Sequence, residues 1–361
     1  MSIQTFAIRL CCWHNLIFFV LLFSCQEKSA EIKIIWTHER ATGISVPAQF
    51  IHGSSHSLLS VRLSSDTATA ILGDLSFHSE EIVFEPLVPF TRGLTYDIFA
   101  ENKRIGQVTI PMADPSGASA LLQIYPTSDT VPENLLKVYF HFSKPMQEGV
   151  SARHIFLVHH QDTLPGVFLD LQPELWDTSR TLLTLWLDPG RIKRDLIPNQ
   201  KMGTPLKQGE RYTLVVNSKW KDIDGLSLKK TVEKEFYVTS RDSLSPDPTR
   251  WKLELPRPHT RDAFVIRFDQ PLDYSLITSS LTIVNDREEK LNGHWKTEKE
   301  EKQITFIPLQ SWGPGNYTLH VSSRLEDLAG NNLNRPFDVD IRNSMHTGSS
   351  ETRSLPFFLS P

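Results

Sequence analysis

A block of sequence occurs twice in this chain, and that repetition limits the folds that the chain can adopt. Residues 212–228 read YTLVVNSKWKDIDGLSL, and residues 317–333, which start 105 positions later, read YTLHVSSRLEDLAGNNL. Eight of the seventeen positions are identical. A unit that is used more than once is first of all a structural module, so we interpret the block as part of a repeated domain.

Alternating side chains predict strands in the same repeats. Residues 138–142 (VYFHF) and 264–268 (FVIRF) have apolar residues at every second position, and a proline follows each segment. A period of two puts every second side chain on one face of a sheet, and proline ends the ladder because it has no N–H to donate. The 23 prolines and the short Val, Ile and Leu stretches between turn residues also indicate an all-β chain.

A third, divergent copy precedes these two. Residues 82–87 (IVFEPL) have the pattern of 304–309 (ITFIPL), and Gly93 and Tyr96 then correspond to the Gly-x-Tyr segment before the later strand. The copies define three domains and a C-terminal tail that we expect to be flexible. The boundaries of these four parts are 30–112, 118–242, 248–343 and 344–361.

The first 24 residues have the pattern of an export signal. An apolar run at 16–24 (LIFFVLLFS) is too short for a hydrocarbon core about 30 Å thick, which needs roughly 20 apolar helical residues. Residues 22–25 (LFSC) resemble the lipobox of bacterial lipoproteins, in which the signal is cleaved before a cysteine that becomes lipidated. This resemblance implies a lipoprotein signal peptide at 1–24 and a membrane anchor at Cys25. An ordinary cleaved signal and an uncleaved anchor are the alternatives.

Three motifs in a fixed order resemble the bacterial Ig-like domains first recognised in S-layer proteins. A strand ends in Phe-x-x-Pro-Leu/Met, a Tyr-x-Leu-x-Val strand follows, and Asp-x-x-Gly-x-x-Leu completes the set at 222–228 and 327–333. The resemblance covers residues 118–343 and fits the first domain only loosely. It implies an all-β fold of three tandem Ig-like β-sandwiches, and a spacer, adhesive or ligand-presenting role without a catalytic centre.

The cysteines and the charge exclude several classes of function. Removal of residues 1–24 leaves Cys25 as the one thiol, which excludes zinc ribbons, thiol redox motifs and cysteine nucleophiles. A formal net charge of −4 gives no basic excess for nucleic acid. No Gly-x-Ser-x-Gly elbow, Walker loop or Gly-x-Gly-x-x-Gly motif is present. We therefore expect no cofactor, no nucleic-acid partner and no enzymatic activity, with hydrolysis of an envelope polymer as the weaker alternative.

Two kinds of metal site can be weighed on spacing. The sequence has 13 histidines, among them His154 with His159-His160, but no HExxH pair that would set two imidazoles on one side of a helix. We interpret these histidines as solvent-facing and expect no metal. The same interpretation applies to His52 with His56.

The motif at 222–225 (DIDG) faintly resembles the start of a calcium loop, but it lacks the later carboxylates and the closing Glu. The third domain keeps Asp222 and Gly225 as Asp327 and Gly330. That pair suits a structural turn, because Asp bonds its own backbone and Gly supplies a positive φ.

The second domain departs from the repeat by an insertion at 190–203. Besides Lys201, its sequence carries three basic residues close together, Arg191, Lys193 and Arg194, in an otherwise acidic chain. Loops on a rigid sandwich are where binding usually resides, so these residues are candidates for contact with a partner.

Two tryptophans of the same domain are further candidates. Aligning Pro189 with Pro308 places Trp186 at an outward position of its strand. With Trp176 it would provide an aromatic platform for a sugar ring or an anchor for a protein. The alternative is that the inserted loop or a neighbouring domain covers both side chains.

The leading hypothesis is a non-catalytic, lipid-anchored protein of the bacterial cell envelope that presents its second domain to another envelope protein. A carbohydrate-binding surface lipoprotein, using the two tryptophans, is the alternative. The outer membrane is favoured because Gln26, after the lipidated cysteine, is not the Asp that retains some lipoproteins at the inner membrane.

Overall fold

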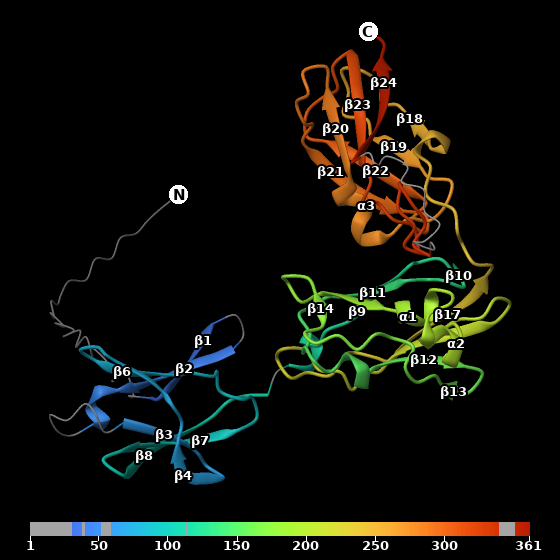
Figure 1. Cartoon of the computed structure of the whole chain (residues 1–361). Helices are drawn as coiled ribbons and strands as arrows, with labels where there is room; N and C mark the ends of the chain where they lie inside the picture. Colours follow the sequence, from blue (N-terminus) through green and yellow to red (C-terminus); the bar gives the residue numbers. More distant parts are fainter. Residues whose placement is uncertain (1–30, 38–39, 52–58, 113, 339–350) are drawn as a thin grey trace, which may run out of the picture. The chain divides into compact units, whose positions relative to one another are not determined.

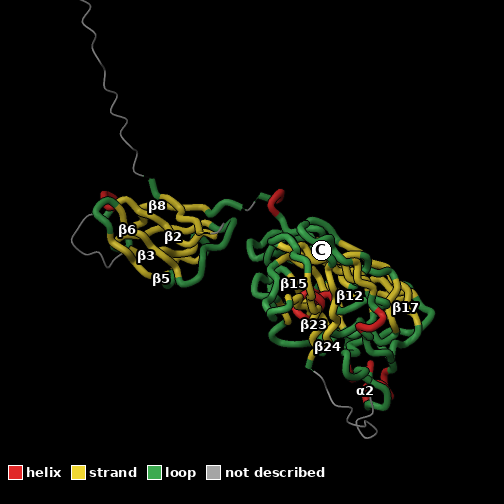
Figure 2. The backbone as a smooth tube through the Cα atoms, turned by 90° about the horizontal axis from the view of Figure 1, so that it is seen from above, coloured by secondary structure: helices red, strands yellow, loops and turns green. Residues whose placement is uncertain are grey.

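The computed structural model describes residues 31–37, 40–51, 59–112, 114–338 and 351–361 (Figure 1). The predicted signal peptide and Cys25 lie outside these residues. The chain divides into two compact units, Met1–Pro111 and Met112–Pro361. Strands are the main regular secondary structure of each unit, and helices are confined to short segments (Figure 2). In the described part of the chain, no helix combines the length and hydrophobicity that crossing a membrane requires.

The first unit is a sandwich of two antiparallel four-stranded sheets, with strand orders β1-β2-β6-β5 and β4-β3-β7-β8. Ile44, Val61 and Ile98 are fully buried between the sheets. The strands are β1 (Lys33–Thr37), β2 (Arg40–Pro47), β3 (Leu59–Leu63), β4 (Asp66–Ala70), β5 (Gly73–Phe77), β6 (Glu81–Pro86), β7 (Thr95–Ala100) and β8 (Lys103–Thr109).

The second unit begins with a sandwich formed by the second domain, whose sheets have the orders β10-β17-β16-β12-β13 and β14-β15-β11-β9. The β10–β17 pair is parallel, and the other strand pairs are antiparallel. The elements are β9 (Leu121–Tyr125), β10 (Thr130–Pro132), β11 (Lys137–Phe142), β12 (Ile155–His159), β13 (Asp162–Thr163), β14 (Leu175–Trp176), β15 (Leu182–Trp186), α1 (Pro189–Ile192), α2 (Ile197–Met202), β16 (Arg211–Val216) and β17 (Val232–Thr239).

The third domain completes the second unit with sheets of order β18-β19-β22-β21 and β20-β23-β24. Its elements are β18 (Lys252–Glu254), β19 (Phe264–Arg267), α3 (Tyr274–Ser280), β20 (Leu281–Asn285), β21 (Gly293–Glu298), β22 (Gln303–Pro308), β23 (Gly315–Ser322) and β24 (Thr352–Leu359).

The alternation of side chains explains why these segments form the two layers of a sandwich. In β19, Phe264 and Ile266 are fully buried, whereas Arg267 is exposed. The two buried residues pair with Phe306 and Ile304 of β22, which are buried as well. Each sheet thus presents one apolar face to its partner sheet. The all-β sandwich fold predicted from the sequence is confirmed.

A buried tyrosine makes the same hydrogen bond in all three domains. Its hydroxyl oxygen accepts from a backbone N–H four or five residues upstream, which ties the start of a strand to the preceding turn. Immunoglobulin-type sandwiches use a similar tyrosine corner. The donor–acceptor pairs are Thr91–Tyr96 (2.9 Å), Lys207–Tyr212 (3.0 Å) and Gly313–Tyr317 (3.1 Å).

The C-terminal segment forms a strand, so the prediction of a flexible tail is wrong for residues 352–359. β24 pairs with β23 along its whole length. Phe357 and Leu359 enter the core of the third domain and are 9% and 2% exposed. Burial of these two large side chains offsets the entropy that ordering the segment costs.

Candidate functional site

The inserted loop, 190–203, is a folded part of the second domain. The carboxylate of Asp188 accepts a hydrogen bond from the N–H of Gly190 at 2.8 Å and so caps α1, which begins at Pro189. Proline fits the first helical position because its missing N–H would have no partner there. Gly203, with a φ of 71°, ends α2 in a backbone conformation that residues other than glycine rarely adopt.

Arg191 braces this loop from within. Its side chain is 9% exposed, and it donates to the carbonyl oxygens of Gly166 (2.8 Å), Gly203 (3.1 Å) and Thr204 (3.3 Å). The neighbouring Ile192 is fully buried in the core of the second domain. The prediction that Arg191 contacts a partner is therefore wrong, because burial commits its donors to the loop itself.

Lys193 and Arg194 face the third domain. Lys193 Nζ lies 4.3 Å from the ring centroid of Phe337, and Arg194 Nε lies 2.9 Å from Oδ2 of Asp338. Arg241 reaches the same carboxylate at 2.7 Å. Both predicted partner-binding residues thus contribute to a contact within the second unit, which holds the loop against the next domain.

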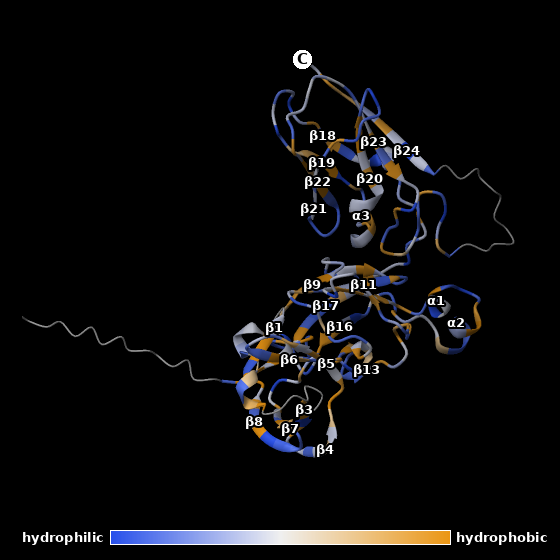
Figure 3. Ribbon diagram, turned by 90° about the vertical axis from the view of Figure 1, so that its left-hand side faces the viewer, coloured by the Kyte–Doolittle hydropathy of each residue, from blue (hydrophilic) through white to orange (hydrophobic). Residues whose placement is uncertain are grey.

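Three apolar side chains of the loop remain exposed. Leu196, Ile197 and Met202 are 44%, 66% and 59% exposed, and we call this group the loop tip. Figure 3 shows α1 and α2 projecting from the body of the second domain. The insertion therefore offers an apolar surface, where the sequence indicated a basic one.

Trp176 belongs to the inner face of its sheet. It pairs with Leu183, which is fully buried, and its ring packs near Phe142 (6.0 Å) and Trp220 (5.8 Å). Its Nε1 donates to Oε2 of Glu174 at 2.8 Å. The side chain is thus half-buried at the edge of the core.

Trp186 lies on the opposite face of the same sheet. It pairs with Lys137, whose Nζ stands 5.1 Å from the ring centroid. The strand pairing places Leu185 at the position of Phe306, whereas the alignment of Pro189 with Pro308 placed it at the position of Ile304. The two assignments differ by two residues. A shift of two keeps each side chain on its face. The two tryptophans are separated by the sheet, so they do not form the single platform that was one of the two hypotheses from the sequence.

A cavity of about 220 Å³ lies in the second domain, beside β12, β15 and the segment 163–171. Its lining includes Leu157, Leu185, Trp186 and Glu174. The carboxylate of Glu174 already accepts three hydrogen bonds, from Gly149 N (2.8 Å), Ser151 N (2.7 Å) and Trp176 Nε1 (2.8 Å). Burial raises the pKa of Glu174, but these hydrogen bonds outweigh it and lower the pKa below its ordinary value. With this polar group satisfied, the cavity offers mainly apolar surface.

The Asp-x-x-Gly motifs form two equivalent turns. In each turn the aspartate Oδ1 accepts from two backbone N–H groups, and the glycine has a positive φ, 82° at Gly225 and 80° at Gly330. Asp222 accepts from the N–H groups of Asp224 and Leu226, and Asp327 accepts from those of Ala329 and Asn331.

The turn of the third domain packs directly on the second domain. The N–H of Leu136 donates to the carbonyl oxygen of Leu328 at 2.9 Å. A Cβ added at Gly330 would collide with the side chain of Leu136. The glycine therefore allows both the left-handed backbone and the close approach of the two domains.

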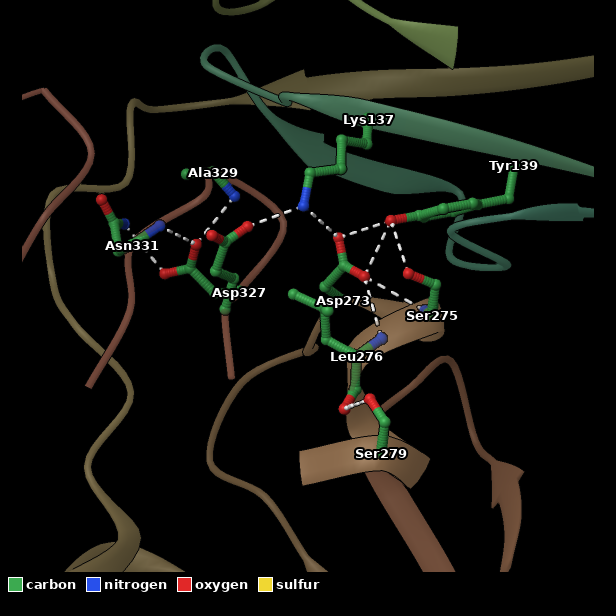
Figure 4. A network of polar contacts seen from close by, with 10 residues as sticks. Lys137, Tyr139, Asp273, Ser275, Leu276, Ser279, Asp327, Ala329 and Asn331 are labelled. Atoms are coloured by element: carbon green, nitrogen blue, oxygen red, sulfur yellow. Dashed lines mark hydrogen bonds and ion pairs between the residues drawn. The ribbon is translucent and has the colours of Figure 1, made fainter. Parts of the chain in front are cut away.

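A polar network joins the same two domains (Figure 4). Asp273 caps α3 and is 4% exposed. Its carboxylate accepts from Tyr139 Oη at 2.7 Å and from Lys137 Nζ at 3.1 Å. Lys137 also lies 2.6 Å from Glu326, and Tyr139 accepts from Ser275 Oγ at 3.3 Å. One cation of the second domain is thus held between two carboxylates of the third.

Two further contacts extend this interface. The rings of Tyr125 and Tyr274 stack with centroids 3.5 Å apart. Glu301 is 2% exposed and accepts from the N–H and the hydroxyl of Thr127 at 2.9 and 2.8 Å. Burial raises the pKa of Glu301 despite these hydrogen bonds.

Burial and neighbouring charges shift two pKa values in this region. Burial lowers the pKa of Lys137, but the charges of Asp273 and Glu326 outweigh it and raise the pKa above its ordinary value. Burial raises the pKa of Asp327 to about 7, although Asn331 donates hydrogen bonds to its carboxylate. The interface therefore keeps its lysine charged and holds one carboxyl that titrates near neutrality.

The roles of Lys137, Tyr139 and Asp273 in this interface were not predicted from the sequence. The strand pattern assigned Tyr139 to the outward face of β11, where it lies, but it gave no indication of what covers that face. A tyrosine beside an outward lysine was the available signal, since large aromatic side chains are common in interfaces.

The histidines weighed above as a metal site, His154 with His159 and His160, do not all come together in the structure, and the side chain of His159 is only 20% exposed. His154 stacks on Trp220, with ring centroids 5.7 Å apart, away from His159 and His160. Burial, and then the charge of Arg153, lowers the pKa of His154. His52 and His56 lie outside the described residues.

The comparisons with known proteins agree with this architecture. Residues 256–342 match the model of a family described as bacterial Ig-like domain. The match covers the strands from β19 to β23 of the third domain, whereas the sequence resemblance extended over residues 118–343. No curated protein matches the chain at a significant level.

Several solved structures resemble this chain weakly. The N-terminal part of the bacterial S-layer protein SbsC is 11% identical with a TM-score of 0.23, over 68% of this chain and 45% of that one. Alpha-2-macroglobulin from Escherichia coli is 11% identical with a TM-score of 0.22, over 56% of this chain and 66% of that one. The Bacteroides ovatus protein SGBP-B, solved with a mixed-linkage heptasaccharide, is 13% identical with a TM-score of 0.18, over 79% of this chain and 58% of that one.

The match thus spans about two thirds or less of each of these chains. At such identities and TM-scores the three structures carry no information about the function of this protein.

Proposed function

We propose that this chain is a non-catalytic, lipid-anchored protein of the bacterial cell envelope whose second domain presents a protein-binding surface. The surface is the loop tip of Leu196, Ile197 and Met202. The partner is another envelope protein, and Cys25 carries the lipid that holds the chain at the membrane.

The observation that carries this proposal is the exposure of three apolar side chains on a braced loop. Protein interfaces are centred on apolar side chains that lose their water on binding. A flexible loop would also lose conformational entropy when it binds, but the buried Arg191 and the contact with Asp338 already fix this loop. The tip is thus both apolar and preorganised.

Two parts of the hypothesis change. The basic residues no longer belong to the binding surface, because Arg191 is buried and Lys193 and Arg194 face the third domain. The glycan alternative loses its main support, since Trp176 and Trp186 lie on opposite faces of one sheet.

A surface variant tests the proposal better than a deletion of the loop. Replacement of 190–203 would also remove the buried Arg191 and Ile192, and a loss of binding would then reflect a damaged core. The triple variant Leu196→Ser, Ile197→Ser, Met202→Ser changes the tip alone. We expect isolation of the tagged protein from its own cell envelope to recover one protein in stoichiometric amount, and this variant to lose it.

The control replaces apolar residues that are equally exposed elsewhere in the second unit. Leu122 and Leu255 are 55% and 46% exposed, and a Leu122→Ser, Leu255→Ser variant should retain the partner. Recovery of the same proteins by the wild type and the tip variant would contradict the proposal.

The lipid anchor can be tested separately. We expect a clickable fatty acid analogue to label the wild-type protein in growing cells and the protein to fractionate with membranes. The Cys25→Ser variant should lose both the label and the membrane association. An unlabelled wild type would refute the anchor without affecting the loop tip.

A further inference from the structure

Three side chains with metal-binding atoms converge at the turn between β12 and β13. Nε2 of His159 lies 3.2 Å from Oε2 of Glu210, and Nε2 of His160 lies 4.0 Å from the same oxygen. The ligand atoms of these three residues all lie within 4.8 Å of one another. Two imidazoles and a carboxylate therefore face a common point.

The backbone conformation of His160 produces this convergence. Adjacent residues of a strand point to opposite faces, so two successive histidines normally diverge. His160 has a φ of 56°, and its ring lies 4.1 Å from that of His159. A residue other than glycine in this left-handed region carries a conformational cost, and such strain often marks functional positions.

The surrounding structure fixes two of the three ligands. The ring of His159 stacks on that of Tyr212 at 4.6 Å, and its side chain is only 20% exposed. The N–H of Glu210 donates to the carbonyl oxygen of Lys207, and the carbonyl oxygen of Glu210 accepts from the N–H of Val238. His160, 76% exposed, leaves the site open to solvent.

We propose that His159, His160 and Glu210 bind a divalent zinc ion. Zinc takes imidazole nitrogens and carboxylate oxygens at 2.0–2.2 Å in a tetrahedron, which places neighbouring ligand atoms about 3.3 Å apart. The two imidazole nitrogens lie 3.2 and 4.0 Å from the Glu210 oxygen and within 4.8 Å of each other, so binding of the ion requires side-chain rotations that bring these atoms to that spacing. The fourth position takes water or a ligand atom of a partner. The site does not depend on the loop tip or on the proposed function.

Calorimetric titration of the purified protein with zinc chloride tests this site. Asparagine adopts the left-handed backbone more readily than most residues, so His160→Asn removes the ligand and retains the turn. Glu210→Gln removes the carboxylate at nearly constant shape. Because loss of even a supporting partner weakens metal binding by about 10–100-fold, we expect each variant to bind zinc at least about tenfold more weakly than the wild type.

His259→Asn is the matched control, because His259 is also an exposed histidine with a positive φ, 62°. It should bind zinc like the wild type. Zinc should also raise the melting temperature of the wild type and of this control, but not that of the two site variants, whose melting temperatures without zinc should equal that of the wild type. Zinc affinity that is undetectable in the wild type, or unchanged in His160→Asn and Glu210→Gln, would overturn the proposal.

Discussion

The role of a charged side chain in this protein depends on its burial and on the groups packed against it, and Arg191 and Asp327 are the clearest cases. The sequence identified both positions, but it predicted the turn at Asp327 and not the role of Arg191. Arg191 bonds carbonyl groups of Gly166 and Thr204, which belong to other parts of the second domain, and no local pattern predicts such partners. Asp327 occupies a turn that the sequence could predict from its Asp-x-x-Gly spacing. Its burial against the second domain is a tertiary feature, and that burial sets its pKa.

Asp327 should make the stability of the protein depend on pH. Its pKa is about 7 in the folded chain against an ordinary value of 3.8, so the folded state binds more protons between these values. The stabilisation by the neutral carboxyl is complete below about pH 4 and is lost as the pH rises through about 7. A shift of this size corresponds to a decrease on the order of 4 kcal/mol in the free energy of unfolding.

Urea denaturation followed by tryptophan fluorescence, at a series of pH values from 4 to 8, measures this decrease. The Asp327→Asn variant, which does not titrate, should have a shallower profile than the wild type over this range. Identical profiles for the two proteins would contradict the assignment of this titration to Asp327.

At the scale of secondary structure, period-two alternation predicted the strands that carry one apolar face, such as β11, β19 and β22. It missed β24, because Pro356 and the polar residues before it indicated a fraying end. β24 lies at the edge of its sheet, where a proline is tolerated. The helices of the inserted loop were not predicted either, since each is shorter than the length over which helical periodicity can be recognised.

Two adjacent phenylalanines of β24 should differ sharply in their effect on stability. Phe357 is 9% exposed and stacks on Phe264, whereas Phe358 is 52% exposed. We expect Phe357→Ala to lower the free energy of unfolding by about 3 kcal/mol, because it leaves a cavity in the core. Phe358→Ala should change it by less than about 0.5 kcal/mol. Equal effects in urea denaturation would mean that β24 is not packed as described.

At the scale of the whole molecule, the second and third domains form one compact unit. The sequence predicted the domains from their repeat, but it placed part of the functional surface on Lys193 and Arg194, which this contact occupies. Repeats reveal what the copies share, and the contact between domains depends on residues that differ between them. Lys137, Tyr139 and Asp273 are such residues.

Lys137 should be important for this contact. Its side chain is 10% exposed between Asp273 and Glu326. Lys137→Met leaves both carboxylates without their cation, and removal of one member of a buried ion pair costs about 3–5 kcal/mol. We expect a loss of about 3 kcal/mol in the free energy of unfolding of the second unit. The exposed Lys230→Met is the matched control, and an equally small effect of both changes would show that the network does not join the domains.

Site-specific photo-cross-linking in living cells tests the central claim, that the loop tip binds an envelope protein. A photoreactive amino acid replaces Ile197 in one form of the protein and the exposed Leu255 of the third domain in another. We predict one discrete adduct with an envelope protein from position 197 and none from position 255. No adduct from position 197, or the same adducts from both positions, would contradict the account.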